Sequence, residues 1–123
     1  GEERVSIPAG TFENDESTGR GIIIDSGTVI TRLVEPAYNP VRDSFRRQVD
    51  SSLTMVEDSS GFFDTCYKTP PSGQGSAFCL AFALPPGGGS DLSILGNQQQ
   101  QNLLVVYDVA GSRLGFASQN CDG

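Results

Sequence analysis

An aspartate ends the most apolar strand-like stretch of this sequence, and its position is the first sign of chemistry. Residues 21–24 read Gly-Ile-Ile-Ile, and Asp25, Ser26, Gly27 and Thr28 follow at once. Burying a carboxylate costs several kcal/mol unless hydrogen bonds or a charged partner compensate it. Asp25 is therefore either a structural acid that caps its own turn or a functional acid, for which acid–base catalysis is the ordinary role.

The elements that must position Asp25 are predicted to be short strands, because apolar runs alternate with Gly, Pro, Ser and Asn along most of the chain. Val29, Thr31 and Leu33 are expected on one face of the strand that follows the aspartate turn. Residues 50–61 are expected to form a polar loop and residues 85–91 a flexible connection. We expect strands at residues 4–7, 21–25, 29–33, 78–84 and 92–96, and a closing hairpin of residues 103–109 and 113–117.

One helix is predicted. Asn39 can cap it, Pro40 suits its first position, and Val41, Phe45 and Val49 recur every four residues. The run NQQQQN at residues 97–102 has the composition of a low-complexity segment, but four glutamines are too few for a prion-like tract. The predicted fold class is mostly β with one short helix.

The composition excludes several classes of site. The chain has no His, so a Ser-His-Asp triad, a Cys-His pair and a His-bearing zinc site cannot be built from it. The net charge of -7 disfavours a nucleic-acid partner. No apolar run approaches membrane-spanning length, so we expect no membrane partner. Because the sequence starts at Gly1 without Met or a signal-peptide pattern, it is expected to be a mature fragment or a processed chain.

The chain has three cysteines, so a single disulfide would leave one cysteine unpaired. Cys66 and Cys79 flank a turn-rich stretch that could close a short disulfide loop. Cys121 would then be free or bonded to another chain. The alternative is three reduced thiols. The spacing lacks any C-x-x-C, so a metal site is the weakest interpretation.

Two apolar segments together carry a family resemblance. The first ends in Asp25 and its Ser-Gly-Thr turn, and the second, Ile94 and Leu95, ends in Gly96. This pattern resembles the pepsin-like aspartic proteases, in which each lobe has two hydrophobic residues, then Asp-Thr/Ser-Gly-Thr/Ser, and later a hydrophobic-hydrophobic-Gly segment beside the aspartate loop. The stretches IPAGTF, PAYNPVRDSFRRQV, FCLAF and LSILGNQQQQNLLVVYDVAGSRLGFASQNC are similar to the plant nepenthesin-type branch and follow its order.

The resemblance implies an aspartic-type endopeptidase with a polypeptide substrate and no metal or cofactor. Asp25 would be the second aspartate of a dyad that shares one proton and activates a water molecule. Gly27 would let a backbone N–H approach the carboxylate, and the Thr28 hydroxyl would donate to its outer oxygen. Ser26 would bond across to the matching loop of the other lobe, and Gly96 would leave room for the loop beside it.

The sequence departs from the family in two respects. Residues 1–123 match only the C-terminal lobe, as a single domain, and Asp15 and Asp91 do not follow apolar strands as a first-lobe aspartate would. The segment around residues 67–78 is also much shorter than in family members. The family's bridge across this segment implies that Cys66 and Cys79 are paired.

A single aspartate leaves several alternatives open. An N-terminal protease lobe could complete the dyad, or a second copy of the chain could do so, as in the retroviral proteases, with Ser26 bonding across the two-fold axis. Without a completed dyad the chain would be inactive. A catalytically silent binding protein, like the xylanase-inhibitor relatives of this branch, is the competing class, and a degenerate product is a further one. The resemblance and the predicted disulfide imply a secreted or vacuolar protein.

Overall fold

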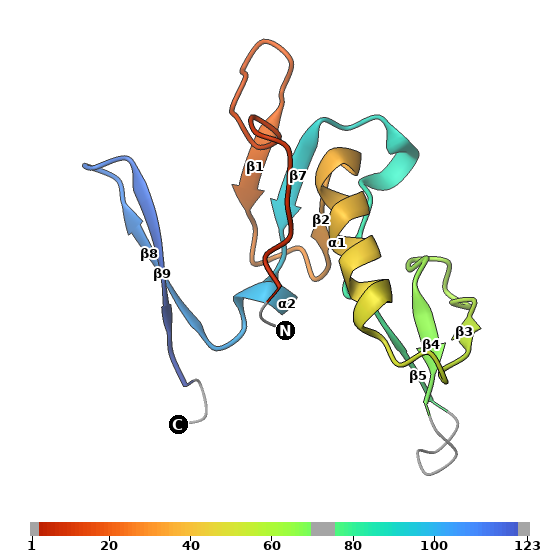
Figure 1. Ribbon diagram of the computed structural model, residues 1–123. Coiled ribbons are helices and arrows are strands. Elements are labelled where there is room, and N and C mark those ends of the chain that lie inside the picture. Colours follow the sequence, from red (N-terminus) through yellow and green to blue (C-terminus); the bar gives the residue numbers. More distant parts are fainter. Residues whose placement is uncertain (1–2, 70–75, 121–123) are drawn as a thin grey trace.

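The computed structural model describes residues 3–69 and 76–120, which form three separate β-sheets and one longer helix (Figure 1). The predicted fold class, mostly β with one short helix, is confirmed. The elements are β1 (Gly21–Ile24), β2 (Thr31–Arg32), α1 (Glu35–Gln48), β3 (Met55–Val56), β4 (Cys66–Lys68), β5 (Ala77–Cys79), β6 (Phe82–Ala83), the 3-10 turn η1 (Pro86–Gly88), β7 (Leu92–Leu95), α2 (Asn97–Gln100), β8 (Leu103–Asp108) and β9 (Arg113–Ser118).

The central sheet has the strand order β1-β7-β2-β6. Strands β1 and β7 are parallel, with Ile24 opposite Leu95. Strand β2 runs antiparallel to β7 and parallel to β6. The predicted strands at 21–25 and 92–96 are thus confirmed within one residue. Because parallel strands end at the same edge of a sheet, the residues after β1 and after β7 emerge side by side.

The helix begins five residues earlier than the sequence pattern predicts. Helix α1 starts at Glu35 after Val34, whose carbonyl accepts the N–H groups of Ala37 and Tyr38 at 2.9 Å. Pro40 lies inside the helix instead of at its first position, so the predicted cap at Asn39 is wrong. Pro40 removes one helix hydrogen bond, and its ring crowds the carbonyl of Pro36, so its position inside the helix carries a cost. Burial of Ala37 and Tyr38, which are 0% and 1% exposed, favours the earlier start.

The core lies between the first turn of α1 and the central sheet. Leu33, Val34, Ala37 and Tyr38 form its buried centre, and Phe82 packs against it with Ile7, Phe12 and Val41. The predicted strand at residues 4–7 is wrong, because this segment is not paired in a sheet.

The predicted strand at 29–33 is much shorter in the structure, since only Thr31 and Arg32 are paired. Thr31 and Leu33 are buried as expected, but Val29 is 53% exposed. The residues before Thr31 belong instead to the loop that follows Asp25.

A three-stranded sheet, β3-β4-β5, lies at the far end of α1 (Figure 1). Cys66 and Cys79 stand opposite each other in it and form a disulfide, the pair that the resemblance implied. Strand β3 occupies part of the predicted polar loop at 50–61, and the predicted strand at 78–84 is divided into β5 and β6, so both expectations are corrected. The N–H of Leu80 donates to the carbonyl of Thr65 at 2.9 Å, which continues the β4–β5 ladder by one bond, and β6 then pairs with β2 in the central sheet. Cys121 lies outside the described residues.

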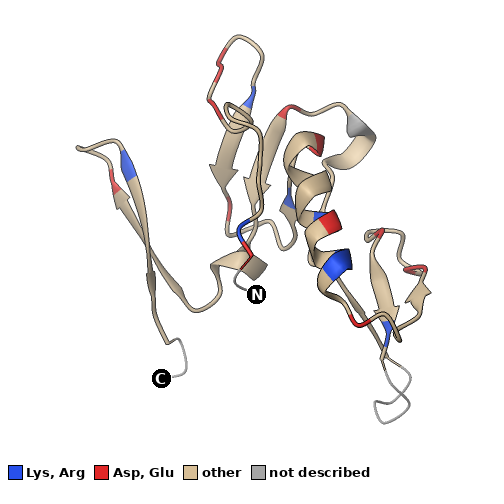
Figure 2. Cartoon of the chain, viewed as in Figure 1, with Lys and Arg blue, Asp and Glu red and all other residues tan. Residues whose placement is uncertain are grey.

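The closing hairpin is confirmed by six register pairs between β8 and β9. It extends away from the other elements (Figure 1), and every residue of β9 is exposed. Its charged residues are Asp108 and Arg113, which form an ion pair at 2.8 Å near the turn (Figure 2).

Candidate functional site

Asp25 and Gly96 are adjacent because the two parallel strands that precede them end together. The N–H of Asp25 donates to the carbonyl of Leu95 at 3.1 Å, which continues the β1–β7 ladder by one bond. Asp25 and Gly96 are far apart in the sequence and come close because their strands pair, since each is the first residue after its strand. The central sheet therefore positions both halves of the predicted pattern at one edge.

The Asp25 carboxylate is held by its own turn. The N–H of Gly27 donates to Oδ1 at 2.8 Å, and the Thr28 hydroxyl donates to Oδ2 at 2.7 Å. The Thr28 hydroxyl and then the Gly27 N–H lower the pKa of Asp25 below its usual value of 3.8. No other carboxylate contributes to that shift among the described residues. Asp25 is thus an ionised, partly exposed acid with one donor on each oxygen.

The glycine in this turn has a steric role. A Cβ at Gly27 would lie 3.1 Å from Oδ1 of Asp25, closer than ordinary van der Waals contact. A side chain at this position would push against the oxygen that the Gly27 N–H binds. The expectation that glycine lets the N–H approach the carboxylate agrees with this contact.

Gly96 is packed directly against the backbone of the aspartate loop. A Cβ there would lie 2.8 Å from the carbonyl oxygens of Thr28 and Val29 and from the carbonyl carbon of Ile30. These atoms are backbone and cannot swing aside as a flexible side chain would. The Gly96 N–H donates to the hydroxyl of buried Thr31 at 2.9 Å. The loop after Asp25 can occupy its position only if residue 96 lacks a side chain.

Helix α2 fixes the loop from the other side. Its first two N–H groups donate into the loop, Asn97 to the Thr28 carbonyl at 2.7 Å and Gln98 to the Val29 carbonyl at 3.2 Å. The side-chain amide of Asn97 donates to the carbonyl of Ser26 at 3.0 Å. Three hydrogen bonds therefore join α2 to the turn that carries Asp25.

The polar run at 97–102 was not recognised as part of the site from the sequence. Besides Asn97, Gln99 donates to the carbonyl of Ala81 at 3.1 Å and accepts from the Thr31 hydroxyl. Gln100 donates to the carbonyl of Leu95 at 2.8 Å. The only indication in the sequence that this run belongs to the site is that it follows directly after Gly96. Three side-chain amides of this run, those of Asn97, Gln99 and Gln100, have specific partners, so the run is specific structure and not low complexity.

Ser26 differs from its neighbours in having a free hydroxyl. It is exposed, and within residues 3–69 and 76–120 its side chain makes no hydrogen bond, whereas its carbonyl is held by Asn97. Over the same residues, no group of three or more acidic, Cys or His side chains could hold a metal ion. The site thus consists of one supported carboxylate with an unoccupied hydroxyl beside it.

The chain matches the family described as "Xylanase inhibitor C-terminal" over residues 1–77 and 72–118. It is 38% identical over 148 aligned residues to "Aspartyl protease 25" of Oryza sativa subsp. japonica, an alignment covering 96% of this chain and 33% of the relative. It is 39% identical to "Aspartyl protease family protein 2" of Arabidopsis thaliana, with 94% and 28% covered. It is 35% identical to "Aspartic proteinase nepenthesin-1" of Nepenthes gracilis, with 98% and 33% covered.

The chain therefore spans about a third of the length of these curated relatives. Their similarity extends over nearly all of its residues, including the aspartate turn, the strand that ends in Gly96 and the closing hairpin. The resemblance to the plant branch of the pepsin-like proteases is confirmed. The chain belongs to the xylanase inhibitor C-terminal family and is a C-terminal lobe of the pepsin-like aspartic protease fold.

Proposed function

We propose that this chain supplies one of the two catalytic aspartates of an aspartic endopeptidase, and that Asp25 is that residue. The observation that carries the proposal is the Asp25 carboxylate itself, ionised and partly exposed at a sheet edge and supported by Gly27 and Thr28. A carboxylate that only capped a turn would not need a second strand, a glycine and a helix packed behind it. Gly96 and Asn97 supply that packing.

In the proposed reaction Asp25 forms a dyad with an aspartate of a partner lobe. Two carboxylates that lie close together cannot both ionise, so they share one proton. The ionised carboxylate removes a proton from water, and the water oxygen attacks the carbonyl carbon of the peptide bond. The protonated carboxyl group hydrogen-bonds the carbonyl oxygen. The C–N bond then breaks as the amine nitrogen takes a proton, leaving a carboxylic acid and an amine.

The partner lobe is proposed to be an N-terminal protease lobe. This is supported by the coverage of the relatives, whose names describe proteases and of which this chain spans only a part. A homodimer that brings two copies of Asp25 together is the second candidate. The free hydroxyl of Ser26 favours it equally, because either partner would present a loop to which Ser26 could donate.

A binding protein without catalysis is the competing function. The observation that favours it is the printed description of the matched family, which refers to a xylanase inhibitor. The intact support of Asp25 argues against it, since binding alone would not require a carboxylate held by Gly27 and Thr28.

We further propose that residues 1–123 form one lobe-like domain shortened around residues 67–78. The family model matches the chain in two parts, residues 1–77 and 72–118, which overlap within this segment. The alignment with the rice relative runs over 148 positions, more than the 123 residues of the chain, so it contains gaps. Both observations support a loss of residues between the two disulfide cysteines.

A secreted or vacuolar location is proposed on the disulfide between Cys66 and Cys79, because such bonds persist in oxidising compartments. None of the helices in the described part of the chain is long and apolar enough to cross a bilayer.

Proteolysis of an unfolded protein substrate across acidic pH tests the proposed function. The chain is assayed alone and together with the N-terminal lobe of the rice relative, each with an Asp25→Asn variant and with a transition-state-mimicking aspartic-protease inhibitor. Activity that needs the added lobe and is lost in Asp25→Asn supports a two-lobed enzyme, and activity of the chain alone supports the homodimer. Asp25→Asn with unchanged activity would exclude the catalytic role.

A further inference from the structure

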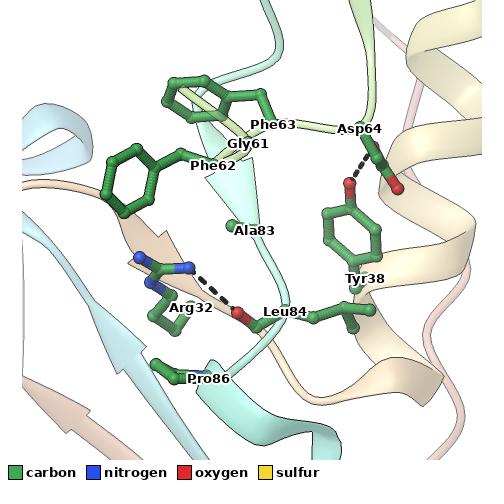
Figure 3. A pocket seen from close by; sticks show the side chains of 9 residues that line it. All are labelled: Arg32, Tyr38, Gly61, Phe62, Phe63, Asp64, Ala83, Leu84 and Pro86. Carbon is green, nitrogen blue, oxygen red and sulfur yellow. Dashed lines mark hydrogen bonds between the residues drawn. The ribbon is translucent and has the colours of Figure 1, made fainter. Parts of the chain in front are cut away.

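A pocket separate from the Asp25 turn lies between β2, β6 and the segment that precedes β4. Its volume is about 370 Å³, and Figure 3 shows the side chains that surround it. Phe62, Phe63, Leu84 and Pro86 supply most of the apolar wall. None of Asp25, Ser26, Gly27, Thr28 or Gly96 lines it. The pocket is therefore an additional feature of the lobe and not an extension of the catalytic turn.

Arg32 is the cation of this pocket, and it has no acidic partner. One of its terminal nitrogens donates to the carbonyl of Leu84 at 3.0 Å, and no carboxylate of the described residues lies within ion-pair distance of it. A guanidinium has five N–H donors, so four remain available. In a chain of net charge -7, a partly exposed arginine without an acidic partner has donors that an anion could accept.

The other charged residue of the pocket, Asp64, is already engaged. Its carboxylate accepts from the Tyr38 hydroxyl and from the Thr65 hydroxyl, the latter at 2.8 Å, and Arg42 lies 3.9 Å away. Figure 3 shows Asp64 and Tyr38 on one side of the pocket, and Arg32 with the Phe62 ring on the other. The pocket therefore presents a free positive charge at one end and no free negative charge at the other.

The apolar wall determines what kind of anion fits. Phe62 is 62% exposed and Leu84 39%, so both residues offer apolar surface that solvent now covers. An inorganic anion would leave this apolar surface exposed to water. We propose that the pocket binds a carboxylate attached to an apolar or aromatic group, such as the free C-terminus of a peptide that ends in phenylalanine, with Arg32 holding the carboxylate and Phe62 covering the apolar group. This proposal does not depend on the proposed protease activity.

A matched pair of probes tests the proposal on the unaltered chain. N-acetyl-phenylalanine carries the carboxylate, and N-acetyl-phenylalaninamide has the same shape without the charge. Each is titrated into the 15N-labelled chain while the backbone signals of Phe62, Phe63 and Leu84 and the Arg32 side-chain N–H are followed. The acid should bind at least about tenfold more tightly than the amide, and added salt should weaken it. Equal binding of acid and amide, or the absence of any shift at these residues, would overturn the proposal.

Two variants then assign the contacts. Arg32→Gln should remove the advantage of the acid over the amide, and Phe62→Ala should weaken both probes. Arg113→Gln is the control, because Arg113 lies on the hairpin and pairs with Asp108, and it should leave binding unchanged. Tighter binding of phenethylamine than of the acid would also contradict the proposal, since it would assign the pocket to a cation. A tetrapeptide ending in phenylalanine that binds more tightly than the acetylated residue would identify peptide ends as the source of the carboxylate.

Discussion

The side-chain amide of Asn97 donates to the carbonyl oxygen of Ser26 at 3.0 Å, although 71 residues separate them in the sequence. The backbone N–H of the same asparagine donates to the Thr28 carbonyl at 2.7 Å. One residue at the start of α2 thus holds both sides of the turn that carries Asp25. The orientation of the carboxylate depends on a helix whose sequence, taken alone, looks like a featureless polar run.

Asn97→Ala should destabilise the turn without unfolding the lobe. It removes one hydrogen bond to a carbonyl that is exposed enough to bind water instead, so a loss of about 1 kcal/mol of unfolding free energy is expected. Urea unfolding measures the stability, and amide hydrogen exchange at Gly27 and Thr28 should become faster. Gln98→Ala is the matched control, because the Gln98 side chain makes no hydrogen bond in the described structure, and it should change neither quantity.

Gly96→Ala should be far more damaging. The added methyl group would lie 2.8 Å from two carbonyl oxygens and a carbonyl carbon of the aspartate loop, so the loop must move. Overpacking against backbone costs about 1–3 kcal/mol or more, which urea unfolding would measure. Gly115→Ala provides the control, since its new methyl group would meet Val106 at an ordinary 3.8 Å. Equal effects of the two substitutions would contradict the proposed packing role of Gly96.

Thr28→Val should raise the pKa of Asp25 towards its ordinary value of 3.8. The Thr28 hydroxyl is the largest cause of the lowered pKa, and valine keeps the shape without the donor. Carboxyl 13C NMR during an acid titration measures the change. Thr28→Ser keeps a hydroxyl and should leave the lowered pKa nearly intact. A Thr28→Val chain that titrates like the unaltered one would exclude this hydrogen bond.

The stability of the lobe should fall in acid. Among the described residues the pKa is lowered below 3.8 for Asp15, Asp25, Asp50, Asp58, Asp64 and Asp108. In all but Asp64 the largest cause is a hydrogen bond from a residue two or three positions later. A lowered pKa in the folded state contributes stability that is fully present above the unfolded pKa and is lost as the pH falls through the folded pKa.

The urea midpoint should therefore be nearly constant from pH 7 to about pH 5 and should decrease below about pH 4. Asp58→Asn should reduce the size of that decrease, because asparagine does not titrate. A midpoint that rises steadily as the pH drops to 3 would show that relief of the net negative charge outweighs these turns.

The disulfide should contribute strongly to the stability of the β3-β4-β5 sheet. It closes a loop with a sequence separation of 13 residues, and removing a cross-link of that size is expected to cost about 3 kcal/mol. Urea unfolding of a Cys66→Ser/Cys79→Ser variant measures the loss. Peptide mapping without reductant should recover Cys66 linked to Cys79, and alkylation of both in the unreduced chain would contradict the pairing.

Local sequence patterns were sufficient to predict the strands that lead to Asp25 and Gly96, because each is an apolar run that stops at a turn residue. The closing hairpin was predictable for the same reason. The start of α1 was not, since the cap-and-proline signal at Asn39 and Pro40 competes with the burial of Ala37 and Tyr38. That burial depends on a sheet formed by residues far along the chain.

The sequence by itself determined the family, the aspartate turn and the glycine that packs beside it, because these depend on residue types at fixed short spacings. The tertiary structure alone decided what Asn97 and Gln99 bind and where Arg32 lies. The sequence shows that a side-chain amide or a guanidinium group is polar, but it does not show what the group binds. The partners are carbonyl oxygens that only the folded chain brings within reach. The carboxylate and the two donors of its own turn could therefore be predicted from the sequence, whereas the contacts from α2 could not.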